Sequence, residues 1–314
     1  MQRPNFFLIG APKAGTTSFA RYLGQHPSVF ISPIKEPSFF APEVVDITPH
    51  ARALFEADAA PLAAYLDSPM RERRDHGIVL GWPEYLKLFK HVRDETAVGE
   101  ASVSYLGSLG APSAIRERIP HARILALLRD PADRLFAHYA ASRATEATDL
   151  TFNAWIDEQI ASEAKRHPPQ GAFWAGRYAL HLERYRASFP VSQIMLLLYD
   201  DYELWPGRVV SEVFTFLGLE ARALIDTSRR HNVTTVPRWP AASRLARRKV
   251  PTLMGAMRQV PGAGRVRDWL RVPSRLTPTV AERARAIDLY RDDITAAARA
   301  LGRDLSAWRD PTRD

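Results

Sequence analysis

The first 25 residues contain the feature that most limits what this chain can fold into: a glycine-bounded loop between a strand and a helix. Asn5 to Gly10 is an apolar run of strand length, and Thr17 to Gln25 repeats its apolar residues at helical spacing. The loop between them has the sequence Gly10-Ala-Pro-Lys-Ala-Gly-Thr-Thr17. In such a loop, backbone N–H groups and the positive end of the helix dipole converge on one point, where an anion can bind. The segment therefore predicts a strand, an anion-binding loop and a helix.

The glycine spacing of this loop matches the P-loop pattern, G-x-x-x-x-G-K-[ST], but its lysine does not. Thr16 stands where the lysine would follow Gly15, and Lys13 lies in the middle of the loop. A magnesium-dependent clamp on β- and γ-phosphates is therefore not expected. We expect Lys13 to reach an oxygen near the 5′ end of a nucleotide. Three residues then offer hydroxyl and N–H donors to a single phosphate: Thr16, Thr17 and Ser18. A glycine turn before a capped helix, binding nothing, is the structural alternative.

Short apolar runs alternate with helical patterns along the next two hundred residues. Runs of strand length occur at Val29 to Ile31, Arg123 to Leu128 and Gln193 to Leu198. Residues 178–189 place large apolar side chains on one helical face, and Pro190 ends that helix. This alternation predicts the α/β class, with a central parallel sheet flanked by helices in three layers.

A length of 314 residues allows one large α/β domain, and no internal repeat or second core is visible. We expect a single domain: residues 5–220 form the nucleotide-binding and catalytic core, 221–278 a basic lid or acceptor segment, and 279–314 a C-terminal helix that packs on the core. Cysteine is absent, which excludes thiol catalysis and disulfides. The apolar runs are too short to span a bilayer and no signal-peptide pattern is present, so we expect a cytoplasmic protein and leave peripheral membrane contact open.

The net charge of +8 is concentrated in one segment. Arg222 to Arg275 contains 13 basic residues and two acidic ones, so the rest of the chain carries −3. We interpret this segment as a lid and acceptor-steering surface for anionic ligands. A solvated basic tail, or an arm for nucleic acid or anionic membranes, is the alternative. Trp239 and Trp269 are widely spaced, which gives little support to single-strand binding, and no nucleic-acid partner is expected.

Five short motifs follow one another between residue 5 and about residue 220. They are Pro12-Lys-Ala-Gly-Thr-Thr-Ser18, Lys35-Glu-Pro-Ser-Phe-Phe40, Gly99-Glu-Ala-Ser102 with Tyr105, Arg129-Asp-Pro-Ala-Asp-Arg134 with His138, and Gly176-Arg-Tyr178 running to Phe189-Pro190. The first resembles the 5′-phosphosulfate loop of sulfotransferases that use 3′-phosphoadenosine 5′-phosphosulfate (PAPS), and the fourth resembles their 3′-phosphate motif. The other three resemble the bacterial, carbohydrate and heparan sulfate branch of that family. The resemblance implies a P-loop-like fold and sulfuryl transfer to a hydroxyl of a saccharide, glycolipid or related metabolite, acidic acceptors included.

The resemblance also implies roles for individual residues. Glu36 would be the general base, and Lys13 would stabilise the leaving 5′-phosphate; no metal is needed. Nucleotide-binding positions would be Pro12, Lys13, Ala14, Gly15, Thr16, Thr17, Ser18, Arg129, Ala137, His138, Tyr178, Arg229 and Arg230. The chain departs from the family pattern at Ala137, where serine is usual, and at Ala101, where several members have lysine. Either His138 or an arginine of the basic segment would replace the serine, or the nucleotide would bind more weakly. His181, on the polar side of its helix, could line the acceptor cleft.

Two interpretations outside this family stay open at the level of sequence. A P-loop nucleotide kinase or NTPase is favoured by the spacing of Gly10 and Gly15 and opposed by the absence of lysine after Gly15. A non-catalytic protein that binds anions through its basic segment is the other. The sequence does not define an oligomeric state.

Overall fold

The structure is a computed structural model that describes residues 2–43, 49–145, 147–221, 225–228, 235–237, 271–273 and 276–313. Its centre is a five-stranded sheet with the order β2-β3-β1-β4-β5, in which all neighbouring strands are parallel. The strands are β1 (Phe6–Leu8), β2 (Val29–Ile31), β3 (Ala97–Ala101), β4 (Arg123–Leu128) and β5 (Ile194–Leu198). A separate antiparallel pair joins β6 (Thr235–Pro237) to β7 (Arg271–Pro273).

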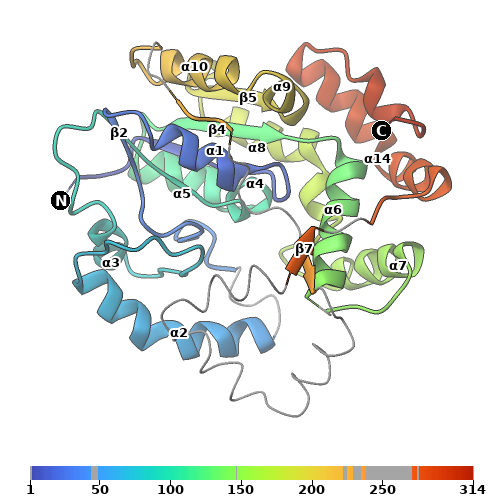
Figure 1. Ribbon diagram of the computed structural model, residues 1–314, viewed down its shortest axis with the longest axis horizontal. Coiled ribbons are helices and arrows are strands. Elements are labelled where there is room, and N and C mark those ends of the chain that lie inside the picture. The colour runs from blue at the N-terminus through green and yellow to red at the C-terminus, as the bar shows by residue number, and fades with distance from the viewer. Residues whose placement is uncertain are drawn as a thin grey trace.

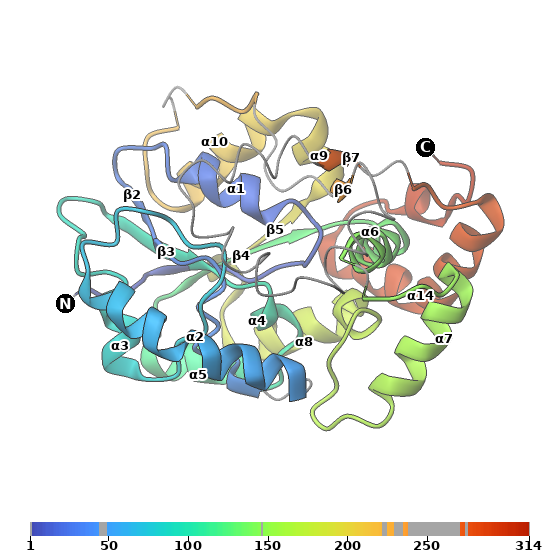
Figure 2. The same ribbon diagram turned by 60° about the horizontal axis from the view of Figure 1, so that its bottom comes forward.

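Helices cover both faces of the sheet. Their bounds are α1 (Thr16–Leu23), α2 (Pro49–Asp67), α3 (Trp82–Lys87), α4 (Ser104–Gly107), α5 (Ala111–Arg118), α6 (Pro131–Ala144), α7 (Phe152–Glu163), α8 (Tyr178–Ser188), α9 (Tyr199–Leu204), α10 (Pro206–Phe216) and α14 (Val280–Leu301), with short 3₁₀ turns at Trp174–Gly176, Val191–Gln193 and Ser306–Arg309. Figures 1 and 2 show α1 and α10 on one side of the sheet and α5 and α8 on the other. The predicted α/β class, with helices on both faces of a parallel sheet, is confirmed.

The sheet is buried because helices cover both faces, which is why its strands are nearly continuous apolar runs. All three residues of β1 are at most 1% exposed, and in β4 every residue after Arg123 is fully buried. The strands predicted at 29–31 and 123–128 have the predicted bounds, and β5 begins one residue later than predicted. The strand to which the sequence assigned no bounds is β3, whose Gly99 and Glu100 interrupt the apolar run.

The parallel arrangement brings the carboxyl ends of the strands to one edge of the sheet. The loop after β1 lies in the middle of this edge, because β1 pairs with β3 on one side and with β4 on the other. The loops after β2 and β3 therefore lie on one side of it, and the loop after β4 lies on the other. Ligands of open α/β sheets bind at this edge.

The C-terminal helix α14 packs against α6 and α8. It begins at a capping box, in which Thr279 accepts from the amide of Glu282 and the Glu282 carboxylate accepts from the amide of Thr279. The division of the chain into core, basic segment and C-terminal helix stays a prediction, because most of residues 222–275 lies outside the described residues. Among the described residues, no helix is both long and apolar enough to cross a membrane.

Gly99 allows β1 and β3 to pack closely, and its replacement tests this packing. A Cβ atom at Gly99 would lie 2.4 Å from the ring of Phe6, its partner in the sheet register. We expect Gly99→Ala to lower the free energy of unfolding by about 1–3 kcal/mol, the usual cost of overpacking a core. Gly207→Ala in α10 is the control, because no described atom lies within 4 Å of its added Cβ. Urea unfolding that finds the two variants equally stable would contradict this account.

Candidate active site

The loop between β1 and α1 is shaped to receive an anion. Lys13 and Gly15 have left-handed backbone conformations, with φ of 68° and 80°. Gly15 is the N-cap of α1, and no described side chain caps this helix, so its first N–H groups are available to an external acceptor. A hydrogen bond of 2.6 Å from the Ala11 amide to the Leu127 carbonyl ties the loop to β4.

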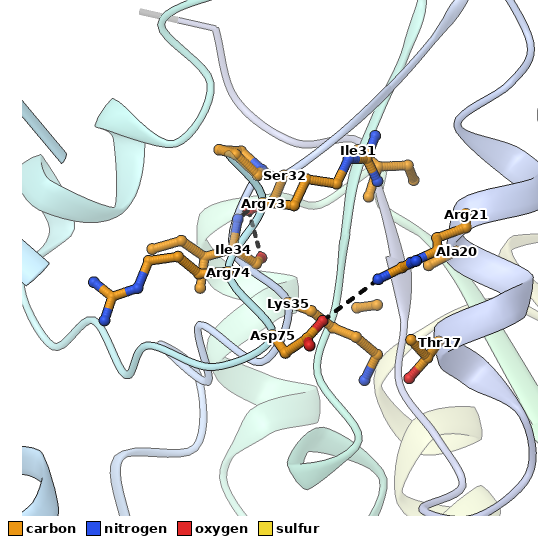
Figure 3. A pocket seen from close by; sticks show the side chains of 12 residues that line it. Thr17, Ala20, Arg21, Ile31, Ser32, Ile34, Lys35, Arg73, Arg74 and Asp75 are labelled. Atoms are coloured by element: carbon orange, nitrogen blue, oxygen red, sulfur yellow. Dashed lines mark hydrogen bonds and ion pairs between the residues drawn. The ribbon is translucent and has the colours of Figure 1, made fainter. Parts of the chain in front are cut away.

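Two lysines bring positive charge to this loop. Lys13 is half-buried, and burial lowers the pKa of its ammonium group, with a further decrease from the charge of Lys35. Figure 3 shows the Lys35 side chain pointing toward Thr17, so the second lysine approaches the loop from the β2 side. Thr17 is partly exposed, whereas Thr16 and Ser18 are buried. An anion in the loop would relieve the repulsion between the two ammonium groups.

Glu36 follows β2 on a short loop that is held against β3. Its backbone has φ of 62°, and its amide donates to the Ala101 carbonyl at 2.9 Å. One carboxylate oxygen, Oε1, contacts Nζ of Lys35, and the other, Oε2, accepts from the amide of Val103 at 2.7 Å. The side chain is only 13% exposed. The carboxylate is therefore fixed in position beside Lys35, which points toward the anion-binding loop.

A fully buried carboxyl group, Glu100, lies beneath the Glu36 loop. Its Oε1 accepts from the Tyr85 hydroxyl at 3.2 Å, and its Oε2 accepts from the Ser102 hydroxyl at 2.8 Å. Ser102 Oγ in turn accepts from the amide of Ser38 at 3.1 Å. The pKa of Glu100 is raised to about 7. Burial is the main cause and the charge of Glu36 adds to it, whereas the hydrogen bonds to the carboxylate act in the opposite direction. This network links the centre of the sheet to the segment that carries Glu36.

Arg129 follows β4 and approaches the anion-binding loop from the other side. One Nη1–H donates to the Lys13 carbonyl at 3.0 Å, and the guanidinium lies over the Tyr199 ring, 4.7 Å from its centroid. The Tyr178 hydroxyl donates to the Arg129 carbonyl at 2.7 Å. The buried Nε of Arg129 has no partner among the described residues. The guanidinium is thus fixed at the loop with a donor still to be satisfied.

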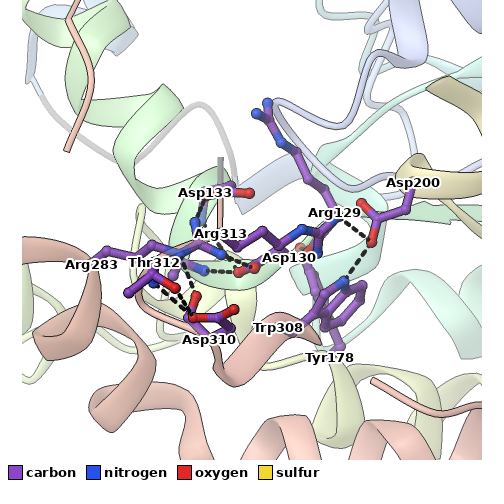
Figure 4. Close-up of polar contacts among 11 residues, drawn as sticks. Arg129, Asp130, Asp133, Tyr178, Asp200, Arg283, Trp308, Asp310, Thr312 and Arg313 are labelled. Carbon is purple, nitrogen blue, oxygen red and sulfur yellow. Dashed lines mark hydrogen bonds and ion pairs between the residues drawn. The ribbon is translucent and has the colours of Figure 1, made fainter. Parts of the chain in front are cut away.

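Asp130 anchors the start of α6 and binds an arginine from the C-terminal helix. Its Oδ1 accepts from the amide of Ala132 at 2.8 Å, and its Oδ2 accepts from Nη2 of Arg283 at 2.7 Å. Arg283 also contacts Asp133, and both Arg283 and Asp130 are buried. Burial and the Asp133 charge raise the pKa of Asp130, whereas the Arg283 guanidinium lowers it. Figure 4 shows the Arg129 side chain extending away from this cluster.

His138 lies on α6 and carries an unsatisfied polar atom. Its Nδ1 is buried and has no hydrogen-bond partner in the described part of the chain. Burial, together with the charges of Arg134 and Lys13, lowers the pKa of His138 to about 3. The imidazole is therefore neutral at pH 7 and can donate one N–H or accept one. The adjacent Ala137 offers no polar atom.

The structure places the predicted site residues around the middle of the sheet edge. The anion-binding loop lies there with Lys13. Arg129 and His138 follow β4 on one side, and Glu36 follows β2 on the other side with Lys35. Tyr178 is fully buried and supports the Arg129 backbone. Arg229 and Arg230 lie outside the described residues.

His181 does not lie on the polar side of its helix, as the sequence suggested. It is fully buried, its Nε2 is 2.8 Å from the Trp174 carbonyl, and Arg184 contacts its Nδ1. The periodicity of this helix follows its large apolar residues and gives no sign that Trp174, before the helix, covers this side. His181 therefore has a structural role.

The structure adds residues that the predicted site did not include. Lys35 directly precedes Glu36 in the same motif, so the sequence could have identified it as a site residue. Tyr199 follows β5, and the rule that ligands gather after strands could have identified it. Arg283 is 153 residues from Asp130 and carries no sequence signal of this contact.

The buried ion pair of Arg283 predicts a large effect on stability. Arg283→Met would leave the Asp130 carboxylate buried without its partner, and we expect a loss of about 3–5 kcal/mol in the free energy of unfolding. Arg291→Met on the same helix is the control: Arg291 forms an exposed pair with Asp288, so its loss should cost less than about 1 kcal/mol. Equal losses in urea unfolding would contradict this assignment.

The raised pKa of Glu100 predicts a specific dependence of stability on pH. The folded state holds this proton up to about pH 7, whereas the unfolded state releases it near the ordinary value of 4.5. The contribution of Glu100 to stability is therefore complete below pH 4.5 and decreases as the pH rises to 7. Relative to Glu100→Gln, the wild type should lose on the order of 2–3 kcal/mol between pH 5 and pH 8. Parallel curves for the two proteins would contradict the prediction.

Comparisons with known proteins agree with this geometry. The sequence profile of the sulfotransferase family matches residues 4–223. Human carbohydrate sulfotransferase 15 is 26% identical over 288 residues, covering 78% of this chain and 51% of the human protein. The mouse bifunctional heparan sulfate N-deacetylase/N-sulfotransferase 4 is 26% identical over 225 residues, covering 69% of this chain and 22% of the mouse protein. The chain thus spans about half the length of the first relative, and less than a quarter of the second.

A solved structure extends the similarity to the whole chain. The sulfotransferase from Alicyclobacillus acidocaldarius is 27% identical, with a TM-score of 0.68, and the match covers 98% of this chain and all of that one. The family profile covers the five strands of the sheet, the anion-binding loop, Glu36 and Arg129. By this match over more than half of its length, the chain belongs to the sulfotransferase family.

Proposed function

We propose that the protein transfers a sulfuryl group from PAPS to a hydroxyl of a saccharide, glycolipid or related metabolite and releases 3′-phosphoadenosine 5′-phosphate (PAP). One observation carries the proposal: a carboxylate fixed by two donors, Glu36, lies across the anion-binding loop from Arg129. Relatives named as carbohydrate and heparan sulfate sulfotransferases support a saccharide acceptor.

The residues around the loop fit a nucleotide with two separate anionic groups. The uncapped N-terminus of α1 and Lys13 would hold the 5′ group. Arg129 and His138 would hold the 3′-phosphate, because Arg129 Nε and His138 Nδ1 have no partner within the described ranges. A phosphate beside His138 would also raise the pKa of the imidazole from its low value. Ala137 contributes no side-chain donor, so His138 takes the place of the serine usual in the family.

The chain's own groups supply a base and charge stabilisation. PAPS, when bound, supplies the sulfuryl group, and its bond to the 5′-phosphate breaks as the acceptor oxygen binds sulfur. Glu36 takes the proton of the acceptor hydroxyl, which makes that oxygen a better nucleophile. Lys13 stabilises the negative charge that develops on the departing phosphate oxygen. The Val103 amide and Lys35 keep the Glu36 carboxylate oriented, which lowers the entropic cost of the aligned arrangement.

Other parts of the proposal rest on the sequence. The basic segment, with Arg229 and Arg230, would cover the nucleotide and steer anionic acceptors. We also propose a cytoplasmic location, on the basis of the sequence alone. The nucleotide kinase alternative loses support, because the chain belongs to the sulfotransferase family and lacks the lysine after Gly15.

The test combines a nucleotide-binding measurement with a base variant. Calorimetry should detect binding of PAP and not of ATP with magnesium, and labelled PAPS should transfer its label to a hydroxyl acceptor from a saccharide panel. Glu36→Gln should lower kcat by about 10²- to 10⁴-fold, the usual contribution of a general base, with PAP affinity within about twofold of the wild type. Glu117→Gln, an exposed glutamate of α5, is the control and should leave kcat unchanged. Normal turnover by Glu36→Gln would remove this residue as the base.

A further inference from the structure

A cationic cavity opens beside the Glu36 loop. It lies between α1, the loop after β2 and the segment that follows α2. Its lining is Thr17, Ala20, Arg21, Ile31, Ser32, Pro33, Ile34, Lys35, Arg73, Arg74, Asp75 and Ala101. Figure 3 shows Thr17 and Lys35 together at one end of this cavity, and the Arg21–Asp75 pair farther along it. The cavity therefore begins at the anion-binding loop and continues away from it.

The sheet order places this cavity on the side away from Arg129. The lining residues after β2 and β3 lie on one side of β1, whereas Arg129 and His138 follow β4 on the other. A nucleotide held by Arg129 would leave the β2 side free. The cavity thus lies where a second substrate would approach Glu36.

Four of the lining residues are cationic and one is acidic. Arg74 forms an ion pair with Asp58 at 2.6 Å, and Lys35 contacts Glu36. Arg21 is 3.8 Å from Asp75, a long pair whose carboxylate side chain is 70% exposed. These contacts leave positive charge in excess over the carboxylates of the lining.

No carboxylate among the described residues pairs with Arg73. Arg73 is an exposed residue, but partial burial of its guanidinium lowers the pKa of this group, and the like charge of Arg21 lowers it further. Two guanidinium groups that repel each other across a cavity form a site that an oxyanion would stabilise. The guanidinium also lies against Gly24, at the C-terminal end of α1, where the helix dipole favours a cation.

Backbone hydrogen bonds fix this cluster relative to the base. The Arg74 amide donates to the Pro33 carbonyl, and the Lys35 amide donates to the Arg74 carbonyl, both at 2.9 Å. These bonds form a parallel bridge between Ile34 and Arg74. The segment that carries Arg73 is therefore joined to the residues directly before Glu36, so an anion held by Arg73 has a fixed relation to the base.

We propose that Arg73, with Arg21, binds an oxyanion carried by the acceptor itself, a carboxylate or a sulfate ester, and so selects acidic saccharides. This inference rests on the proposed function and adds to it the chemical class of the acceptor. It places acceptor recognition in the cavity between α1 and the segment after α2, apart from residues 222–275.

The experiment compares acceptors that differ only in charge. The probes are a uronate-containing oligosaccharide, the same oligosaccharide with its carboxyl groups reduced, and a neutral saccharide bearing one sulfate ester. For the wild type, we expect a KM at least tenfold lower for the acidic acceptors than for the reduced one. Arg73→Gln should raise KM for the acidic acceptors about tenfold, leave KM for the reduced acceptor unchanged and keep kcat within about twofold. Arg71→Gln, an exposed neighbour outside the cavity lining, is the matched control.

Each outcome separates this inference from the proposed function. Arg73→Lys should recover part of the lost discrimination, because it retains the charge without the planar fork. An equal rise in KM for charged and reduced acceptors would overturn the inference and indicate a structural role at the end of α1. Transfer to neutral acceptors alone would also overturn it and leave the sulfotransferase proposal intact. PAP binding without transfer to any acceptor would instead contradict the proposed function. If the uronate and the sulfate ester differ in their response to Arg73→Gln, the larger response identifies the anion.

Discussion

The hydrogen-bonded position of β1 between two parallel strands is the constraint on which the rest of the structure depends. Because β1 pairs with β3 and β4, the loop that follows it lies between two sets of loops with different chemistry. Arg129 arrives from the β4 side, and Glu36 arrives from the β2 side. In the function we propose, this loop would contact the nucleotide on the side of Arg129 and the acceptor on the side of Glu36. A strand order that placed β2 beside β4 would bring Glu36 to the side of Arg129.

The electrostatics of this edge favour a charged ligand over the empty site. Burial lowers the pKa of Lys13 and of His138, so both groups are less stable as cations than they would be in water. Arg129 Nε and His138 Nδ1 are buried with no hydrogen-bond partner among the described residues, which is also unfavourable. A bound polyanion would reverse each of these effects. Binding of a polyanion should therefore increase the stability of the folded protein.

The sequence predicted the local elements well because each is determined by local patterns. The strand at 123–128 follows from its apolar run and has its predicted bounds, and the C-terminal helix expected within residues 279–314 is α14. The motif that contains Glu36 also identified the segment that lies beside the anion-binding loop. Contacts between distant residues could not be predicted in this way. The spacing of nearby residues does not indicate that His181 is buried against Trp174. It also does not indicate that Arg283 pairs with Asp130.

The C-terminal residues contact the loops on the β4 side of the sheet, although the family profile ends at residue 223. Arg283 neutralises the buried Asp130, which caps α6 and directly follows Arg129. Farther along, Trp308 donates from Nε1 to Asp200 at 2.8 Å, next to the Tyr199 ring on which Arg129 lies. The residues that follow Arg129 and Tyr199 directly, Asp130 and Asp200, are thus both held from the C-terminal region. Because an unpaired buried carboxylate is costly, the Asp130–Arg283 pair joins the loop after β4 to α14. The last forty residues therefore help to fix the guanidinium that would bind the 3′-phosphate.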